Sequence, residues 1–246
     1  PLRDLRISVT DQCNFRCRYC MPKEKFGSRH KFLAHTELLT FEEILMVAKA
    51  FSALGVEKIR LTGGEPLLRR HIEELVAKLK ALETPTGKSL EVAMTTNAAI
   101  LGRKAKALKA AGLDRVTVSL DALTEDLFQA INDVGFPAYE VLKGIHAARE
   151  AGLPVKVNTV VKRGMNEEEI LPLAKTFRGT GITLRFIEYM DAGTANGWRM
   201  DDVVPSSEIV RRINEVWPIA PSEALYRGEV AERWHYLDGA GEVGFI

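Results

Sequence analysis

Apolar and polar residues recur along the chain with two different periods, and segments of the two kinds alternate. Short runs with an apolar residue at every second position predict β-strands, and longer runs with apolar residues three or four positions apart predict amphipathic helices. The predicted strands cover 5–10, 58–63, 90–96, 115–121, 155–161 and 182–189. The predicted helices cover 41–55, 71–82, 102–112, 139–152 and 167–181. This alternation is typical of an α/β fold, and six units fit a partial (β/α)6 TIM-like barrel better than a doubly wound sheet.

The starts of two predicted helices carry local signals. Thr40 followed three residues later by Glu43 predicts a capping box. Asn166 predicts the N-cap of the helix that opens with the glutamates 167–169, and we expect these glutamates to face solvent. Near the end of the chain, 206–217 predicts a further helix, and the dipeptide Asp238-Gly239 predicts a hairpin turn.

One face of each predicted strand is polar, although strands of a parallel sheet are usually apolar on both faces. If the apolar face meets the helices, the polar face lines the inside of the barrel. Four cations fall on this face: Arg6, Arg60, Lys156 and Arg185. Only Glu91 and Asp121 are obvious internal anions, so a polyanionic ligand such as a triphosphate would balance the rest. The alternatives are an antiparallel sheet with one wet face, or cations at strand ends that water solvates.

Composition narrows the class of protein. The 246 residues are 46% hydrophobic and 27% charged, with a formal net charge of +1, which argues against a nucleic-acid binder or a membrane-surface protein. Charged residues interrupt every apolar run before it reaches a membrane-spanning length, and the first residues lack the apolar core of a signal peptide. An odd number of cysteines without an export signal predicts reduced thiols and a cytoplasmic protein.

All three cysteines lie within eight residues, as Cys13, Cys17 and Cys20. They follow the first predicted strand, at the end of the barrel where such folds place their chemistry. Three thiolates in a short loop can hold an iron–sulfur cluster that keeps one of its four irons open. A structural zinc site completed by His30 or His35 is the alternative.

The spacing C-x3-C-x2-C, with Tyr19 before the last cysteine, resembles the cluster loop of the radical S-adenosylmethionine (SAM) enzymes. TGGEP at 62–66 resembles the motif of these enzymes for the SAM amino group. Further motifs resemble, in order and over nearly the whole chain, the GTP 3′,8-cyclase family, which begins molybdenum cofactor biosynthesis. These motifs are RDLRISVTDQCNFRCRYCMP, KIRLTGGEPLLR, TTN, VSLDAL, VKVNTVV and RFIEYMDAG.

The resemblance implies a set of roles. A 4Fe-4S cluster would be held by Cys13, Cys17 and Cys20. SAM would be bound by Tyr19, Gly64, Ser119 and Met190. GTP would be bound by Arg6, Arg60, Thr95 and Lys156, and we add Arg185 from its place on the polar face. No catalytic residue is implied beyond the cluster and SAM.

The resemblance also implies a reaction. One electron from the cluster would cleave SAM to methionine and a 5′-deoxyadenosyl radical, and this radical would take the hydrogen from C3′ of GTP. The product would be (8S)-3′,8-cyclo-7,8-dihydroguanosine 5′-triphosphate. A one-electron reductase or flavodoxin-type donor, and a downstream cyclic pyranopterin monophosphate synthase, are the implied partners. We expect no nucleic acid or membrane partner, and we carry a homodimer as a further expectation.

The sequence departs from this family at its C-terminal side. Family members carry a second 4Fe-4S cluster on three further cysteines, whereas this sequence has no cysteine after Cys20. We expect residues 1–190 to form the barrel and 191–246 an incomplete extension. We interpret the chain as a piece of a longer protein rather than a variant without the second site, and we doubt that it is a competent cyclase alone. Two other hypotheses stay open: a different radical SAM enzyme, such as a peptide-modifying one, and a non-enzymatic zinc protein.

Overall fold

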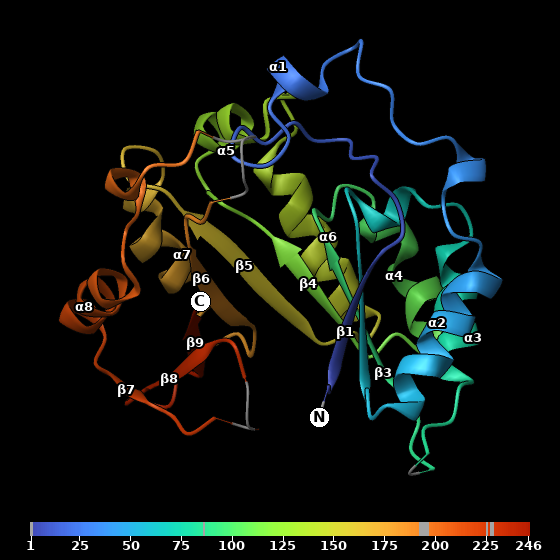
Figure 1. Ribbon diagram of the computed structural model, residues 1–246. Coiled ribbons are helices and arrows are strands. Elements are labelled where there is room, and N and C mark those ends of the chain that lie inside the picture. The colour runs from blue at the N-terminus through green and yellow to red at the C-terminus, as the bar shows by residue number, and fades with distance from the viewer. Residues whose placement is uncertain (1, 86, 192–196, 225, 227–228) are drawn as a thin grey trace. The chain divides into compact units, whose positions relative to one another are not determined.

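The computed structural model describes residues 2–85, 87–191, 197–224, 226 and 229–246 (Figure 1). The end of the motif RFIEYMDAG therefore lies outside the described residues. The chain forms two compact units. The first contains the chain up to Asn14, Arg29–Val118 and Val141–Val155, and the second contains Phe15–Ser28, Ser119–Glu140 and Lys156–Ile246. The cysteine loop is thus divided, with Cys13 in the first unit and the other two cysteines in the second.

The first unit is built on parallel strands with helices between them, as predicted (Figure 1). Its strands, in sheet order, are β1 (Asp4–Ser8), β2 (Lys58–Thr62), β3 (Glu91–Thr96) and β4 (Arg115–Ser119), whose last residue already belongs to the second unit. Its helices are η1 (His35–Glu37), α2 (Phe41–Ala53), η2 (Pro66–Leu68), α3 (Ile72–Lys80) and α4 (Leu101–Ala110).

The alternation of apolar and polar residues in these strands reflects burial. Ile59 and Leu61 of β2 are fully buried, and so are Val92 and Met94 of β3. The helices supply the other side of this core with Ile44, Leu75, Leu79, Leu101 and Leu108. The predicted capping box is confirmed, because Thr40 accepts a hydrogen bond from the Glu43 amide while the Glu43 carboxylate accepts one from the Thr40 amide.

The second unit combines parallel and antiparallel pairing. Its strands, in sheet order, are β5 (Val155–Val161), β6 (Thr183–Glu188), β9 (Glu242–Phe245), β8 (Glu232–Tyr236) and β7 (Ile219–Pro221). β5, β6 and β9 are parallel, whereas β8 is antiparallel to both of its neighbours. The predicted hairpin is confirmed as β8–β9, and β9 extends the sheet beside β6. The domain division at residue 190 stays a prediction.

The helices of the second unit are shorter on average. They are α1 (Lys23–Phe26), α5 (Glu125–Asn132), η3 (Glu167–Glu169), α7 (Ile170–Phe177), η5 (Met200–Asp202) and α8 (Ser206–Val216). α6 (Ala138–Glu150) begins in this unit and continues in the first. Within the described residues, no helix combines the length and the apolar character that crossing a membrane requires.

The predicted helix start at Asn166 needs two corrections. The Asn166 side chain does not cap the helix, since its amide donates to the carbonyls of Val160 and Asp121 at 2.8 and 2.7 Å. Glu169 is only 5% exposed rather than solvated, and its carboxylate accepts a 2.6 Å hydrogen bond from the Leu123 amide. Both side chains tie the turn after β5 to the turn after β4, which a purely local pattern does not reveal.

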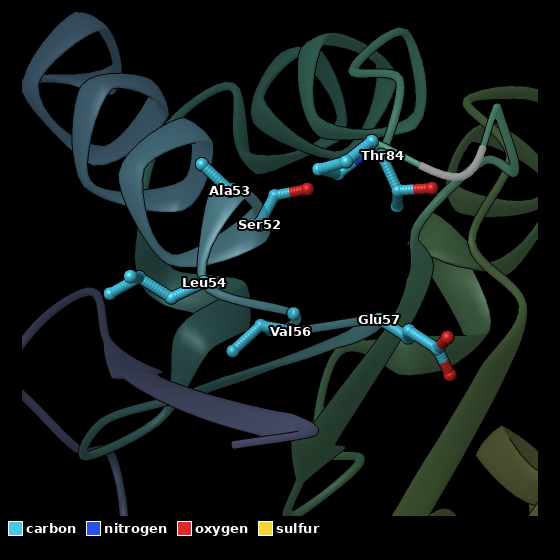
Figure 2. Close-up of a pocket in the computed structure, with 8 residues that line it drawn as sticks. Ser52, Ala53, Leu54, Val56, Glu57 and Thr84 are labelled. Atoms are coloured by element: carbon cyan, nitrogen blue, oxygen red, sulfur yellow. The ribbon is translucent and has the colours of Figure 1, made fainter. Parts of the chain in front are cut away.

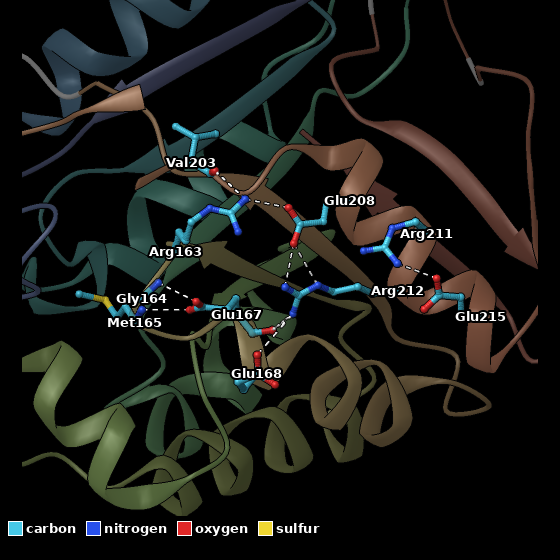
Figure 3. A network of polar contacts seen from close by, with 10 residues as sticks. All are labelled: Arg163, Gly164, Met165, Glu167, Glu168, Val203, Glu208, Arg211, Arg212 and Glu215. Carbon is cyan, nitrogen blue, oxygen red and sulfur yellow. Dashed lines mark hydrogen bonds and ion pairs between the residues drawn. The ribbon is translucent and has the colours of Figure 1, made fainter. Parts of the chain in front are cut away.

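A network of charged side chains connects α8 to the turn after β5 (Figure 3). The Glu208 carboxylate lies 2.7 Å from both the Arg163 and the Arg212 guanidinium groups. Glu167 accepts hydrogen bonds from the amides of Gly164 and Met165 at 2.7 and 3.0 Å. Since Arg163 is exposed, solvent screens its ion pair with Glu208 and weakens its contribution to stability.

A pocket of about 250 Å³ lies in the first unit (Figure 2). It is lined by the last two residues of α2, by residues 54–57 between α2 and β2, and by Thr84 and Pro85. Residues 52–57 precede β2, and Thr84 and Pro85 precede β3, whereas the TGGEP motif follows β2. The pocket is therefore at the opposite end of β2 from the motif that the resemblance assigns to SAM.

Candidate functional site

The first half of the cysteine loop, Thr10–Asn14, lies against the TGGEP turn. The Gly64 amide donates to the Thr10 carbonyl at 2.8 Å, and the Glu65 amide donates to the Gln12 carbonyl at 2.7 Å. A Cβ atom on Gly64 would lie 2.2 Å from the Gln12 carbonyl oxygen, closer than any real contact. Glycine is required at this position because two backbone segments meet there.

Glu65 joins the turn after β2 to the turn after β3. Its side chain is only 1% exposed, and it accepts hydrogen bonds from the Thr96 hydroxyl, the Asn97 amide and the Leu67 amide at 2.7, 2.7 and 3.0 Å. Burial raises the pKa of the carboxyl group, and the three hydrogen bonds act against that rise. A buried carboxylate with three donors fixes the position of both turns.

Asn97 extends this contact to the cysteine loop itself. Its side-chain nitrogen donates to the Asn14 side-chain oxygen at 2.8 Å and lies 3.8 Å from the Cys13 sulfur. We call the contacts of Thr10–Asn14 with Gly64, Glu65 and Asn97 the first anchor. Glu65 lies within TGGEP and Asn97 within TTN, but neither residue was among the predicted site residues. For Asn97 the available signal was a polar residue directly after a buried strand.

The second half of the loop, Phe15–Met21, lies against α5 and the turn that follows it. The Phe15 ring is 5.2 Å from the Phe136 ring and 6.3 Å from the Phe128 ring, measured between centroids. The amides of Arg16 and Arg18 donate to the carbonyls of Asn132 and Ile131 at 2.9 and 3.2 Å. α5 was not predicted, because its eight residues give too short a pattern.

Tyr19 adds a buried polar contact to this half. Its hydroxyl donates to the Asp121 carboxylate at 2.7 Å, and the other Asp121 oxygen accepts from the Val160 amide at 2.9 Å. Burial raises the pKa of Asp121 to about 6, against the effect of these two donors. Burial also raises the pKa of Tyr19 well above its ordinary value, and nearby Asp121 raises it further. We call the contacts of Phe15–Met21 with α5, its following turn and Asp121 the second anchor.

The cysteines project from a backbone that both anchors hold. All three carry thiol side chains outside any disulfide; Cys13 and Cys17 are half-buried and Cys20 is exposed. The amides of Cys20 and Met21 both donate to the Cys17 carbonyl, which folds this part of the loop into a tight turn. In the described part of the chain, no three His, Cys, Asp or Glu side chains are grouped around one point as a single metal ion would require. The donor set of three thiols on one short loop fits a cluster with three thiolate ligands.

The polar face of the first unit brings two predicted nucleotide ligands together. Arg6 and Arg60 are cross-strand neighbours, and the same row continues through Ala93 to Arg115. Arg6 is exposed rather than buried as expected, and it donates to the Thr62 hydroxyl at 3.4 Å. Thr95 lies opposite Thr117, one row closer to the ends of the strands.

Glu91 pairs with two cations that the sequence analysis did not assign to a site. Its carboxylate lies 3.1 Å from the Arg115 guanidinium and 3.9 Å from the Lys58 ammonium. Burial lowers the pKa of Lys58, while Glu91 acts to raise it. The internal anion of this face is thus placed beside Arg115 and Lys58.

The polar face of the second unit carries the other two predicted cations. Lys156 is opposite Thr183, and Arg185 lies between Asn158 and Gly244. A Cβ atom on Gly244 would lie 2.9 Å from Cγ of Arg185, so the arginine side chain runs across a position that only glycine leaves open. Of the remaining predicted SAM ligands, Ser119 ends β4, and Met190 follows β6 with 61% of its surface exposed.

Comparison with known proteins places these features in a family. The sequence model of the Radical SAM superfamily matches residues 7–177, and that of Molybdenum Cofactor Synthesis C matches 182–246. A GTP 3′,8-cyclase of Acidothermus cellulolyticus is 54% identical over 247 aligned positions, which span 100% of this chain and 67% of that protein. The chain belongs to the GTP 3′,8-cyclase family of radical SAM enzymes. The radical SAM resemblance of the cysteine spacing and TGGEP is confirmed, and so is the cyclase family predicted from the full series of motifs. This chain is also 45% identical to a GTP 3′,8-cyclase of Staphylococcus aureus, and the alignment spans 71% of that protein.

Solved structures agree on the fold. Streptococcus suis SuiB bound to S-adenosylmethionine matches with a TM-score of 0.67 and 18% identity, over 86% of this chain and 46% of SuiB. The structure of anSMEcpe with bound AdoMet matches with a TM-score of 0.64 and 16% identity, over 88% of this chain and 58% of that one. These similarities confirm the predicted α/β fold.

Proposed function

We propose that this protein is a GTP 3′,8-cyclase that converts GTP to (8S)-3′,8-cyclo-7,8-dihydroguanosine 5′-triphosphate, in the first step of molybdenum cofactor biosynthesis in the cytoplasm. The observation that carries the proposal is the cysteine loop. Three thiols lie on a backbone that hydrogen bonds hold on both sides, in a chain of this family. The proposal covers activity, cofactors and substrate together.

The loop and its neighbours would hold the cofactors. Cys13, Cys17 and Cys20 would bind the 4Fe-4S cluster, and bound cluster and SAM would supply the radical that removes hydrogen from C3′ of GTP. The Gly64 amide is already bonded to Thr10, so its carbonyl is the group that would accept from the SAM amino group. Tyr19, Ser119 and Met190 would complete the SAM site.

The cations on the two polar faces would hold GTP. Neighbouring guanidinium groups such as those of Arg6 and Arg60 suit phosphate oxygens, because each can donate two parallel hydrogen bonds. Thr95 would add a hydroxyl in the first unit. Lys156 and Arg185 would add positive charge from the second.

Further components extend the proposal. A one-electron reductase or flavodoxin-type protein would reduce the cluster, and a cyclic pyranopterin monophosphate synthase would consume the product. A second 4Fe-4S cluster would require cysteines beyond those of this sequence. We therefore expect SAM cleavage and nucleotide binding from this chain, with weak cyclisation. A homodimer is part of the proposal.

Anaerobic reconstitution tests the cofactor part. The protein is incubated with iron and sulfide and then given dithionite, SAM and GTP. We expect a brown protein with about four irons per chain, and 5′-deoxyadenosine in the products. A colourless protein that binds zinc instead would favour the zinc hypothesis, and iron binding without 5′-deoxyadenosine would contradict radical chemistry.

Nucleotide binding tests the substrate part. Arg60→Ala should weaken GTP binding by roughly 10- to 100-fold, because a charged hydrogen-bond donor is lost, with iron content unchanged. Arg103→Ala, on the exposed surface of α4 in the same unit, is the matched control and should bind GTP like the wild type. Equal losses of iron and GTP affinity in Arg60→Ala would contradict the assignment of the polar face. A wild type that binds no GTP would favour another radical SAM substrate.

A further inference from the structure

We propose that Asn97 is a positioning residue for the cluster, donating a hydrogen bond to the Cys13 thiolate that raises the reduction potential of the cluster and slows its loss. The inference rests on the proposed function, because it requires Cys13 to be a cluster ligand. It concerns residues of the first unit alone, and it adds a role that neither the cysteine spacing nor the TGGEP motif assigns.

The orientation of the Asn97 amide is fixed by its neighbours. Its side-chain oxygen accepts a 3.0 Å hydrogen bond from the Ala99 amide, so this end of the group must be the carbonyl. The nitrogen therefore faces the cysteine loop. An amide nitrogen carries two hydrogens, and the two neighbours on that side are the Asn14 oxygen at 2.8 Å and the Cys13 sulfur at 3.8 Å.

The backbone of Asn97 is also held in place by hydrogen bonds. The backbone nitrogen of Asn97 donates to the buried Glu65 carboxylate at 2.7 Å, and the hydroxyl of the preceding residue, Thr96, donates to the same carboxylate. The Thr96 hydroxyl also accepts from the Ala98 amide at 3.0 Å. Asn97 can therefore keep its place when Cys13 changes its charge or its ligand.

The consequence for a bound cluster follows from charge. A thiolate accepts hydrogen bonds more strongly than a thiol, and the sulfurs gain negative charge when a cluster is reduced. A donor aimed at one of these sulfurs stabilises the reduced form more than the oxidised form, so it raises the reduction potential. Groups that orient a metal ligand also strengthen metal binding, typically by 10- to 100-fold.

The test compares reconstituted wild type with Asn97→Ala by potentiometric titration and by the rate at which a chelator removes iron. We expect the ratio of reduced to oxidised cluster at a fixed potential to fall roughly tenfold, which is about 59 mV for one electron. Iron loss should become roughly tenfold faster. Asn97→Asp keeps the acceptor for Ala99 but has no donor for sulfur, and it should lower the potential at least as far.

Thr96→Val is the control for a merely structural effect. It removes a hydrogen bond to the same Glu65 carboxylate but no donor to sulfur, so it should lower Tm and leave the potential at the wild-type value. A wild-type potential in Asn97→Ala, or an equal change in Thr96→Val, overturns the inference while cluster binding and the proposed function stand. A wild-type protein that takes up no iron overturns the proposed function and this inference with it.

Discussion

The two anchors hold adjacent halves of one loop by different physical means. The first is polar: backbone hydrogen bonds join Thr10–Asn14 to the TGGEP turn, and Glu65 and Asn97 extend them. The second depends mainly on an aromatic side chain, because the 4% exposed Phe15 packs between rings that α5 and its following turn provide. The hydrogen bonds of the first anchor fix the orientation of the groups they join, whereas the buried ring of the second anchor contributes mainly to stability.

This difference fits the places of the cysteines. The side-chain amide of Asn97 in the first anchor is oriented toward the Cys13 sulfur. Cys17 and Cys20 instead follow Phe15 in a tight turn, in which backbone amides donate to the Cys17 carbonyl. A loss in the first anchor should therefore change the properties of the site as well as stability. A loss in the second should mainly change stability.

The largest effect should come from Phe15→Ala. Removal of a buried phenylalanine typically lowers the free energy of unfolding by 3–5 kcal/mol, and we expect about 4 kcal/mol here. Urea denaturation of the protein without cluster measures it. Phe15→Leu keeps most of the apolar volume and should lose under about 1.5 kcal/mol, so equal losses in both variants would show that the ring packing is unimportant.

Glu65→Ala should be next in size. It leaves the Thr96 hydroxyl and the amides of Leu67 and Asn97 without their acceptor, at roughly 1–3 kcal/mol each before water and relaxation compensate. We expect a loss of about 3 kcal/mol in urea denaturation. Exposed Glu74 on α3, changed to alanine, should lose under about 0.5 kcal/mol. A Glu65→Ala loss as small as that of the control would contradict the first anchor.

Much of the fold could be predicted from the sequence because its signals are local. Strand periodicity placed β2, β3, β5 and β6 to within a residue or two, and Thr40 with Glu43 placed the start of α2. The first strand was predicted to reach Thr10 but ends at Ser8, because Thr10 binds the TGGEP turn instead. That contact joins residues more than fifty positions apart.

The types of residue in the candidate site could be predicted from the sequence, but the residues that hold them in place by hydrogen bonds could not. The cysteine spacing and the glycines of TGGEP are short local motifs, so their chemistry can be recognised from a few neighbouring residues. Two of the three partners of Glu65 lie 31 and 32 residues away, and the partner of Tyr19 lies 102 residues away. No local pattern says which buried carboxylate meets which donor, so these roles required the structure.

The contact between Tyr19 and Asp121 in the second anchor should make the free energy of unfolding depend on pH. Burial raises the pKa of Asp121 from 3.8 to about 6, so the folded protein keeps a proton there that the unfolded chain releases. The stabilising contribution of this group is therefore complete below about pH 4 and is lost as pH rises to about 6. The difference amounts to roughly 3 kcal/mol as an upper value.

Asp121→Asn provides the comparison, since asparagine does not titrate. Urea denaturation of both proteins between pH 4 and pH 7 should show the wild type losing stability relative to the variant as pH rises. A constant difference between the two over this range would mean that the carboxyl group is ionised in the folded protein at pH 4. The second anchor would then include a buried negative charge, and it would resemble the first more closely.

The smallest effect should come from Glu208→Ala, which sets the scale for contacts that are not buried. Glu208 bridges Arg163 and Arg212 between α8 and the turn after β5, in the same unit as the second anchor (Figure 3). The two arginines lower the pKa of its carboxyl group, yet solvent screens such pairs, so we expect a loss of about 1 kcal/mol or less. The loss should shrink further at high salt, where ion pairs are screened and the Phe15→Ala loss is unchanged. Glu208 has two charged partners, Arg163 and Arg212. A larger loss of stability in Glu208→Ala than in Phe15→Ala would therefore show that polar contacts, and not burial, set the stability of this unit.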